Sequence, residues 1–282
     1  MLPNLSDDCR RLAALALMED GGRDLTTDVT VPSVFPATGQ LEFRHNGVLA
    51  GQAYADAVAT ACNCRIGWRF AEGSSIRGKI VVGDVSGELA MILRAERPIL
   101  NLLQRASGIA TLTRQFVEAV AGTGCRVLHT RKTAPGLRTF DLNAVLAGGG
   151  ALHRTDLAQV VMVKDNHWKA LIRQGRSLED AAREARSRGA SRVYVEVEAE
   201  HQVKQAATAG ADRLLVDNQS PEVARKWGAL ARSLKPGIEI EATGGITLAN
   251  ARAYADAGAD FISIGALTHS VTAADISLEI AG

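Results

Sequence analysis

The spacing of apolar residues changes along the chain and predicts two halves of different texture. Up to about Ala95, an amphipathic helix near Leu5–Met18 precedes short alternating stretches, which are typical of an antiparallel sheet. A long helical pattern then runs from about Arg97 to Ala121. From Cys125 onward, short β-branched runs alternate with helical patterns, which indicates βα units and a parallel sheet.

The second half contains at least six expected strands, separated by expected helices. The strands are Arg126–His129, Val160–Lys164, Val193–Val197, Arg213–Asp217, Ile238–Glu241 and Phe261–Gly265. The helices are Ser177–Arg188, His201–Ala209, Pro221–Leu234 and Leu248–Gly258. So many strands in a short stretch favour a closed or nearly closed barrel, with a doubly wound sheet as the alternative.

Polar residues gather where these strands end. The third strand runs into Glu196-Val197-Glu198, and the fourth ends in Asp217-Asn218. A charge after one strand is commonly a solvated terminus, but the same event at six successive strands places all of these groups on one rim. In α/β barrels that rim carries the active site.

Charge refines this interpretation. The 282 residues include 32 Lys and Arg against 31 Asp and Glu, a net charge of +1, which argues against a nucleic-acid or membrane-surface partner. Yet Arg126–Arg173 carries eight basic residues against three acidic ones, which predicts a pocket for a polyanionic small molecule. No apolar run approaches the roughly 20 residues of a membrane span. Leu12–Met18 lacks a signal-peptide pattern, and the four cysteines suit reduced thiols, so we expect a soluble cytoplasmic protein.

Two further features of the rim suggest phosphate chemistry. Thr243-Gly244-Gly245 and Gly265-Ala266 each leave a strand and enter a helix, where backbone N–H groups can bind phosphate. Glu198 and Asp217 end neighbouring strands and could hold a hydrated Mg²⁺. Spacing alone leaves an equal alternative, in which the two carboxylates accept salt bridges from the arginines.

These residues resemble the quinolinate phosphoribosyltransferase family, also called nicotinate-nucleotide pyrophosphorylase (carboxylating). The resemblance covers nearly the whole chain in collinear order. Its most specific segments are Thr130-Arg131-Lys132-Thr133, followed by Pro135-Gly136-Leu137-Arg138, and Lys164-Asp165-Asn166-His167.

The resemblance implies an α/β fold with an N-terminal α/β sandwich and an incomplete, seven-stranded α/β barrel. The expected domains are residues 1–108 and 109–272, with a tail at 273–282 that returns to the first domain. It also implies a homodimer, or a larger assembly of dimers, whose active site borrows residues from the partner subunit.

The implied reaction joins quinolinate to phosphoribosyl pyrophosphate with Mg²⁺, giving nicotinate mononucleotide, pyrophosphate and CO₂ in NAD biosynthesis. The resemblance assigns the basic quinolinate pocket to Arg97 (from the neighbouring subunit), Arg131, Lys132, Thr133, His153, Arg154 and Lys164. It assigns the 5′-phosphate to Thr243, Gly244, Gly245, Ile264, Gly265 and Ala266. Lys132, Glu198 and Asp217 would be catalytic, with Glu198 and Asp217 holding the ribose hydroxyls and the magnesium.

Two other functions compete with this one. A barrel lyase or aldolase could use Lys164 as a Schiff base. A non-catalytic carrier or sensor of phosphorylated metabolites would also need the basic rim, although it gains nothing from two carboxylates there. A related subgroup associated with molybdenum transport shares the fold, but the intact motifs at 130–133 and 164–167 place this chain with the transferases.

Overall fold

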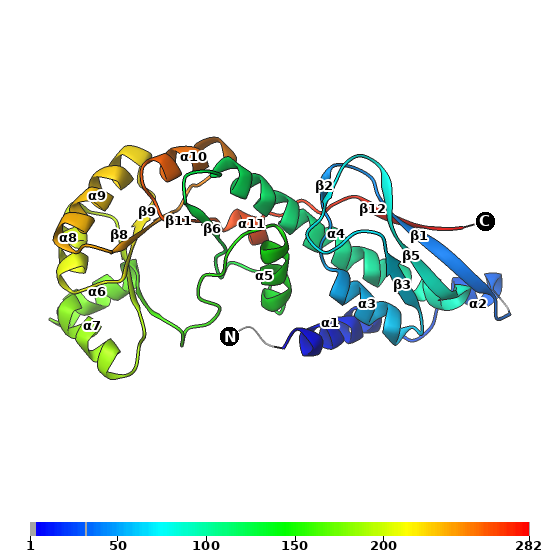
Figure 1. Ribbon diagram of the computed structural model, residues 1–282. Coiled ribbons are helices and arrows are strands. Elements are labelled where there is room, and N and C mark those ends of the chain that lie inside the picture. The colour runs from blue at the N-terminus through cyan, green and yellow to red at the C-terminus, as the bar shows by residue number, and fades with distance from the viewer. Residues whose placement is uncertain (1–3, 32, 282) are drawn as a thin grey trace. The chain divides into compact units, whose positions relative to one another are not determined.

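The computed structural model describes residues 4–31 and 33–281, which form two compact units. The first consists of residues up to Arg114, Lys132–Gly149 and residues from Ala266 onward. The second consists of Gln115–Arg131 and Gly150–Gly265. Figure 1 shows the first unit built on antiparallel strands and the second on parallel strands flanked by helices.

The first unit contains a four-stranded sheet in the order β12-β1-β5-β3. Its strands are β1 (Pro36–Phe43), β3 (Arg65–Trp68), β5 (Ile80–Glu88) and β12 (Ile276–Ile280), and β2 (Gly47–Val48) pairs separately with β4 (Ser75–Ile76). All pairings are antiparallel, as expected from the alternating stretches. Leu41 and Phe43 on β1 point to the same face and are fully buried, because alternate residues of a strand share a face.

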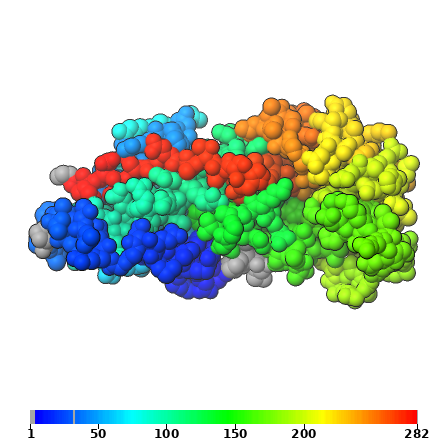
Figure 2. All heavy atoms as spheres, turned by 180° about the vertical axis from the view of Figure 1, so that it is seen from behind, coloured from blue at the N-terminus to red at the C-terminus, as the bar shows by residue number. Residues whose placement is uncertain are grey.

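The C-terminal segment belongs to this sheet. Leu278 on β12 pairs with Leu41, and the Ala274 N–H donates to the Gln104 carbonyl at 2.9 Å. The Gln104 side chain in turn donates to the Ile276 carbonyl at 2.8 Å. Figure 2 shows this segment in red along the surface of its unit.

The first unit also contains helices. They are α1 (Leu5–Glu19), α2 (Leu25–Thr30), α3 (Gln52–Ala61), α4 (Leu89–Ala119), α5 (Arg138–Ala147) and α11 (Ala266–His269). Of these, α1, α3 and α4 pack residues against this sheet in one core cluster. The predicted long helix begins earlier than expected, at Leu89, and runs through Pro98. Its buried face, which includes Ile92, Ile99 and Leu103, packs in the core and outweighs the hydrogen bond that a proline removes.

The second unit contains six parallel strands in the order β6-β11-β10-β9-β8-β7, so the predicted α/β fold class is confirmed. They are β6 (Arg126–Leu128), β7 (Val161–Val163), β8 (Val193–Val197), β9 (Arg213–Asp217), β10 (Glu239–Thr243) and β11 (Phe261–Ser263). Within the described ranges β7 and β6 do not pair, which leaves the barrel open. A single parallel bridge joins Leu128 to Ala151 and is the only trace there of a seventh strand.

Helices flank this parallel sheet, as Figure 1 shows. They are α6 (Asp165–Arg173), α7 (Leu178–Ser187), α8 (Glu200–Thr208), α9 (Pro221–Leu234) and α10 (Leu248–Asp256). Four of them were predicted, whereas no helix was expected at the position of α6. The backbone N–H of Lys164 donates to the Nδ1 atom of His167 at 3.0 Å, which starts α6 directly after β7.

Two expectations from composition can be compared with the structure. All four cysteines are free thiols in the structure, and all four are buried. No helix in the described part of the chain is both long and apolar enough to cross a bilayer.

Gly108 packs closely against the backbone of Thr272 within the first unit. A Cβ atom at this position of α4 would lie 2.2 Å from the Thr272 carbonyl oxygen, which is backbone and cannot move away easily. We therefore expect Gly108→Ala to lower the free energy of unfolding by about 1–3 kcal/mol. Urea unfolding measures this. Gly22→Ala, where nothing lies within 4 Å, is the matched control and should change it by less than about 0.5 kcal/mol. Equal stability of the two variants would contradict this account of the packing.

Candidate functional site

Charged side chains line the carboxyl edge of the parallel sheet. A small apolar cluster on one face of the sheet contains Met162, Tyr194 and Leu215. Lys164, Glu196 and Asp217 follow two residues later at the ends of β7, β8 and β9, so they share that face. The apolar layer therefore forms the floor beneath these three charged groups.

Lys164 and Glu196 form an ion pair at this edge. Glu196 is buried, and its backbone carbonyl accepts from the indole Nε1–H of Trp168 at 2.8 Å. This contact ties β8 to α6. The pair engages the Lys164 amino group with a carboxylate, whereas a Schiff-base lysine presents its amine to a carbonyl substrate, so the geometry disfavours the lyase alternative.

Asp217 faces two other carboxylates. Burial raises the pKa of Asp217, and the negative charges of Glu196 and Glu198 raise it further, against the opposing effect of Lys164. Its Oδ2 atom accepts from Asn218 at 2.8 Å. Among the described residues, neither Asp217 nor the exposed Glu198 forms a salt bridge with an arginine. The salt-bridge alternative for these two carboxylates is therefore unsupported, and the edge has oxygen donors available for a cation.

Two guanidinium groups, those of Arg131 and Arg154, lie near each other and are half-buried. Burial lowers the pKa of Arg154, and the positive charge of Arg131 lowers it further. The Nε atom of Arg131 is buried without a hydrogen-bond partner in the part of the chain that the structure describes. Within the same residues, no salt bridge joins either side chain to a carboxylate. A buried donor without a partner, such as Arg131 Nε, is costly, so this pair of cations fits an anionic ligand.

His153 belongs to a buried polar network beneath these arginines. Its Nε2 atom lies 3.1 Å from Glu241, and its backbone N–H donates to the Nε2 atom of His129 at 3.0 Å. Glu241 also accepts from Arg213 at 2.9 Å and from the Ser263 hydroxyl. Burial alone would raise the pKa of Glu241, but the His153 and Arg213 contacts outweigh burial and leave it lowered.

The predicted glycine turn follows β10. Gly244 and Gly245 have φ angles of +80° and +62°, a backbone conformation that other residues rarely adopt. A Cβ atom at Gly244 would lie 2.2 Å from the Asn218 side chain. Gly244 and Gly245 therefore form a tight turn without side chains at the same edge of the sheet, where the backbone can approach a ligand closely.

Other predicted residues fall outside this unit. The predicted site residues are divided between the two units. The second unit contains Arg131, His153, Arg154, Lys164, Glu198, Asp217, Thr243, Gly244, Gly245, Ile264 and Gly265. The first unit contains Arg97, Lys132, Thr133 and Ala266. Arg97 is an exposed residue of α4. The Lys132 carbonyl accepts from the Thr268 hydroxyl at 2.9 Å, which anchors its loop inside the first unit.

The prediction that all eight basic residues of Arg126–Arg173 line one pocket is wrong in part. Arg126 begins β6 and is exposed, so it lies at the opposite end of the strand from the carboxyl edge. Arg173 lies in the last turn of α6, which runs back from that edge. Lys169 is exposed beside Asp165, at 3.4 Å. Strand position, and not charge density along the chain, selects which cations can line the site.

The structure places four further residues in the polar networks, with no role predicted for them from the sequence: Glu196, Arg213, Glu241 and His129. One sequence feature could have indicated these polar networks. In Val193–Val197, Glu196 is the one charged residue of a strand that is buried throughout, and Glu241 lies in the middle of a buried run of β10. A charge at such a position needs a partner, so it marks a polar network.

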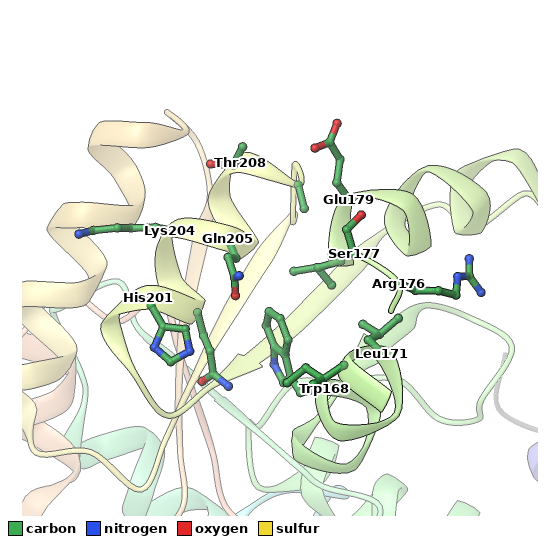
Figure 3. Close-up of a pocket in the computed structure, with 13 residues that line it drawn as sticks. Trp168, Leu171, Arg176, Ser177, Glu179, His201, Lys204, Gln205 and Thr208 are labelled. Atoms are coloured by element: carbon green, nitrogen blue, oxygen red, sulfur yellow. The ribbon is translucent and has the colours of Figure 1, made fainter. Parts of the chain in front are cut away.

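A surface cavity of about 420 Å³ lies elsewhere in this unit, between α6, α7 and α8 (Figure 3). Its lining includes Trp168, Leu171, Leu178, His201 and Gln205 but none of the predicted site residues. The candidate site is therefore the carboxyl edge of the sheet and not this cavity.

The second unit is an open α/β barrel whose edge carries both cations and carboxylates, and the same chain contains an antiparallel-sheet unit. This combination defines a class of enzymes that act on anionic small molecules. Two family models match the chain: the quinolinate phosphoribosyl transferase N-terminal domain at residues 24–107 and its C-terminal domain at residues 109–279. The chain belongs to the quinolinate phosphoribosyl transferase family. The predicted resemblance and the predicted activity, which makes nicotinate mononucleotide in NAD biosynthesis, are both confirmed.

Named relatives agree with this assignment. A human nicotinate-nucleotide pyrophosphorylase [carboxylating] is 38% identical over 280 residues, covering 98% of this chain and 89% of that protein. A probable nicotinate-nucleotide pyrophosphorylase [carboxylating] of Bacillus subtilis is 36% identical over 270 residues, covering 93% and 90%. The solved structure of the nicotinate-nucleotide pyrophosphorylase from Francisella tularensis superposes with a TM-score of 0.91 at 31% identity, covering 99% of this chain and 98% of that one.

His129 should make folding pH-dependent. Burial lowers the pKa of His129 to about 4, against the opposing effects of the Thr130 hydrogen bond and the negative charge of Glu241. The unfolded chain therefore binds a proton at a higher pH than the folded protein does. Stability is lost as pH falls from about 6.5 towards 4, amounting to about 2 kcal/mol between pH 7 and pH 5.

Urea unfolding of wild type and His129→Asn at both pH values measures this effect. The variant should lose that part of the pH dependence, because asparagine does not titrate there. His201→Gln, at an exposed histidine, is the control and should retain it. An identical pH dependence in wild type and His129→Asn would contradict the assignment.

Proposed function

We propose that the carboxyl edge of the parallel sheet is the site where this chain transfers the phosphoribosyl group of phosphoribosyl pyrophosphate to quinolinate. The observation that carries the assignment is the half-buried pair Arg131 and Arg154, neither of which forms a salt bridge with a carboxylate among the described residues. Quinolinate carries two adjacent carboxylates, so it needs two or more such cations at once. We place the cations of Lys164, Lys132 and the partner's Arg97 around the same substrate, with Thr133 beside them.

The donor substrate needs the carboxylates and the glycine turn. Asp217 and Glu198 suit the ribose hydroxyls, because a carboxylate accepts hydrogen bonds from both. Gly244 and Gly245, together with Thr243 and the Ile264–Ala266 segment, suit the 5′-phosphate, since their backbone can approach it closely.

A magnesium ion fits this donor set. Mg²⁺ prefers one or two carboxylates together with water and substrate phosphate oxygens, and Asp217 and Glu198 supply two carboxylates. The like charges that raise the pKa of Asp217 would be relieved by a cation there. When bound, the ion would neutralise part of the pyrophosphate charge.

Catalysis then consists of positioning and charge stabilisation. Arg131, Arg154 and Lys164 would hold the quinolinate carboxylates so that the pyridine nitrogen faces the ribose C1. As the bond from C1 to pyrophosphate breaks, positive charge develops on the ribose, and Asp217 or Glu198 stabilises it. The new nitrogen–carbon bond makes the ring a pyridinium, whose positive charge stabilises the electron pair left at C2 when the 2-carboxylate departs as CO₂. A proton from water then adds to C2 and gives nicotinate mononucleotide.

The direct test mixes the protein with quinolinate, phosphoribosyl pyrophosphate and Mg²⁺ and follows nicotinate mononucleotide by chromatography. We expect product from quinolinate and little or none from nicotinic acid, because one carboxylate cannot engage both arginines. EDTA should suppress the reaction. Equal turnover of both acids would contradict the proposed pocket.

We further propose that the protein is a cytoplasmic homodimer with domains at residues 1–108 and 109–272, and that Arg97 acts in the partner's site.

Arg97→Ala and Arg131→Ala should each abolish turnover. Co-expressed, they form mixed dimers that contain one intact site, so activity should return to about a quarter of wild type. Light scattering measures the dimer independently. No recovery in mixed dimers would show that Arg97 acts within its own chain.

A further inference from the structure

Both ring nitrogens of His153 are already engaged inside the protein. Nδ1 accepts the backbone N–H of Arg154 at 2.6 Å, and Nε2 lies 3.1 Å from a carboxylate oxygen of Glu241. An ionised carboxylate can only accept, so Nε2 carries the proton and Nδ1 does not. The ring is only 7% exposed. His153 therefore has no nitrogen left with which to bind a substrate.

Glu241 is itself rigidly held. It is 1% exposed and accepts from Arg213 at 2.9 Å and from the Ser263 hydroxyl. The Arg213 guanidinium packs over the Phe261 ring, 3.8 Å from its centroid. β9, β10 and β11 thus fix the carboxylate that orients the imidazole.

The segment around His153 is fixed on both sides of the ring. The His153 N–H donates to His129 at 3.0 Å, and the Arg154 N–H donates to the ring. The Arg154 guanidinium therefore projects from a backbone whose position depends on the imidazole, and it reaches the neighbourhood of Arg131.

We propose that Glu241, supported by Arg213, is a positioning residue of the quinolinate pocket. Its carboxylate stabilises the Nε2–H tautomer of His153. In this tautomer His153 positions the backbone that carries Arg154 and donates no hydrogen bond to quinolinate. The role of Arg154 rests on the proposed function, whereas the tautomer of His153 does not.

Glu239 is the control that distinguishes a positioning role of Glu241 from a purely structural ion pair with Arg213. It lies two residues before Glu241 on β10 and accepts from the same Arg213, at 2.8 Å, and from Arg192, but the structure gives it no contact with His153. A role in general stability would make the two glutamates equivalent. A positioning role would not.

The first experiment reads the tautomer directly by ¹⁵N–¹H correlation of the six histidine rings in selectively labelled protein. The His153 signal is assigned by its absence in His153→Asn. We expect a pure Nε2–H tautomer in free wild type, unchanged when quinolinate saturates the protein. A proton on Nδ1, or transfer of the Nε2–H hydrogen bond to bound quinolinate, would overturn the proposal.

The second experiment uses variants. Arg213→Met with Glu241→Met removes both buried charges together and so preserves packing. We expect it to mix the His153 tautomers and to lower kcat/KM for quinolinate about 100-fold, while KM for phosphoribosyl pyrophosphate changes little. Glu241→Gln, which keeps an acceptor for Nε2–H, should retain the tautomer, and Glu239→Gln should retain both the tautomer and the kinetics.

The outcomes are distinct. Loss of activity in Glu239→Gln equal to that in the double variant, or wild-type quinolinate kinetics in the double variant, would overturn the positioning role. If the double variant does not fold, Glu241→Gln provides the test. Mixed His153 tautomers together with an unchanged KM for quinolinate in that variant would overturn the positioning role. Absence of any turnover in wild type would refute the proposed function and leave the tautomer measurement valid.

Discussion

The parallel sheet depends on one buried charge, the carboxylate of Glu241. It has no access to solvent, so its donors must come from the protein: Arg213 on β9, Ser263 on β11 and the ring of His153. Removing one partner of such a buried pair typically costs about 3–5 kcal/mol, because the remaining charge stays desolvated. A shift of β10 by one residue would turn Glu241 to the opposite face, so this contact also fixes the strand register.

Once that register is fixed, the functional edge follows from geometry. Residues two apart on a strand share a face, so the apolar side chains of Met162 and Leu215 are followed by Lys164 and Asp217 at the edge. The edge combines unpaired guanidinium groups with carboxylates at the end of β9 and after β8. These charges are spread over separate strands, so an anionic ligand can be held from several directions without a covalent nucleophile.

Much of this architecture could be predicted from the sequence. The six parallel strands and α9 follow from runs that are long or strongly periodic, and the strand-end positions of Lys164 and Asp217 follow with them. α5 and α6 could not be predicted in the same way. Each begins within a polar motif, at Arg138 and Asp165, so its first turn has the composition of a loop. The early start of α4 was missed for the related reason that Pro98 normally marks a helix boundary.

The sequence by itself determined the family, the alternation of strands and helices and the strand-end residues, because these depend on local periodicity and on motifs contiguous along the chain. Only the tertiary structure decided which charges neutralise one another. Glu196 pairs with Lys164, Glu241 with Arg213 and His153, while Arg131 and Arg154 have no such carboxylate partner among the described residues. Such pairings join residues tens of positions apart, and they depend on strand order and register, which no local pattern encodes.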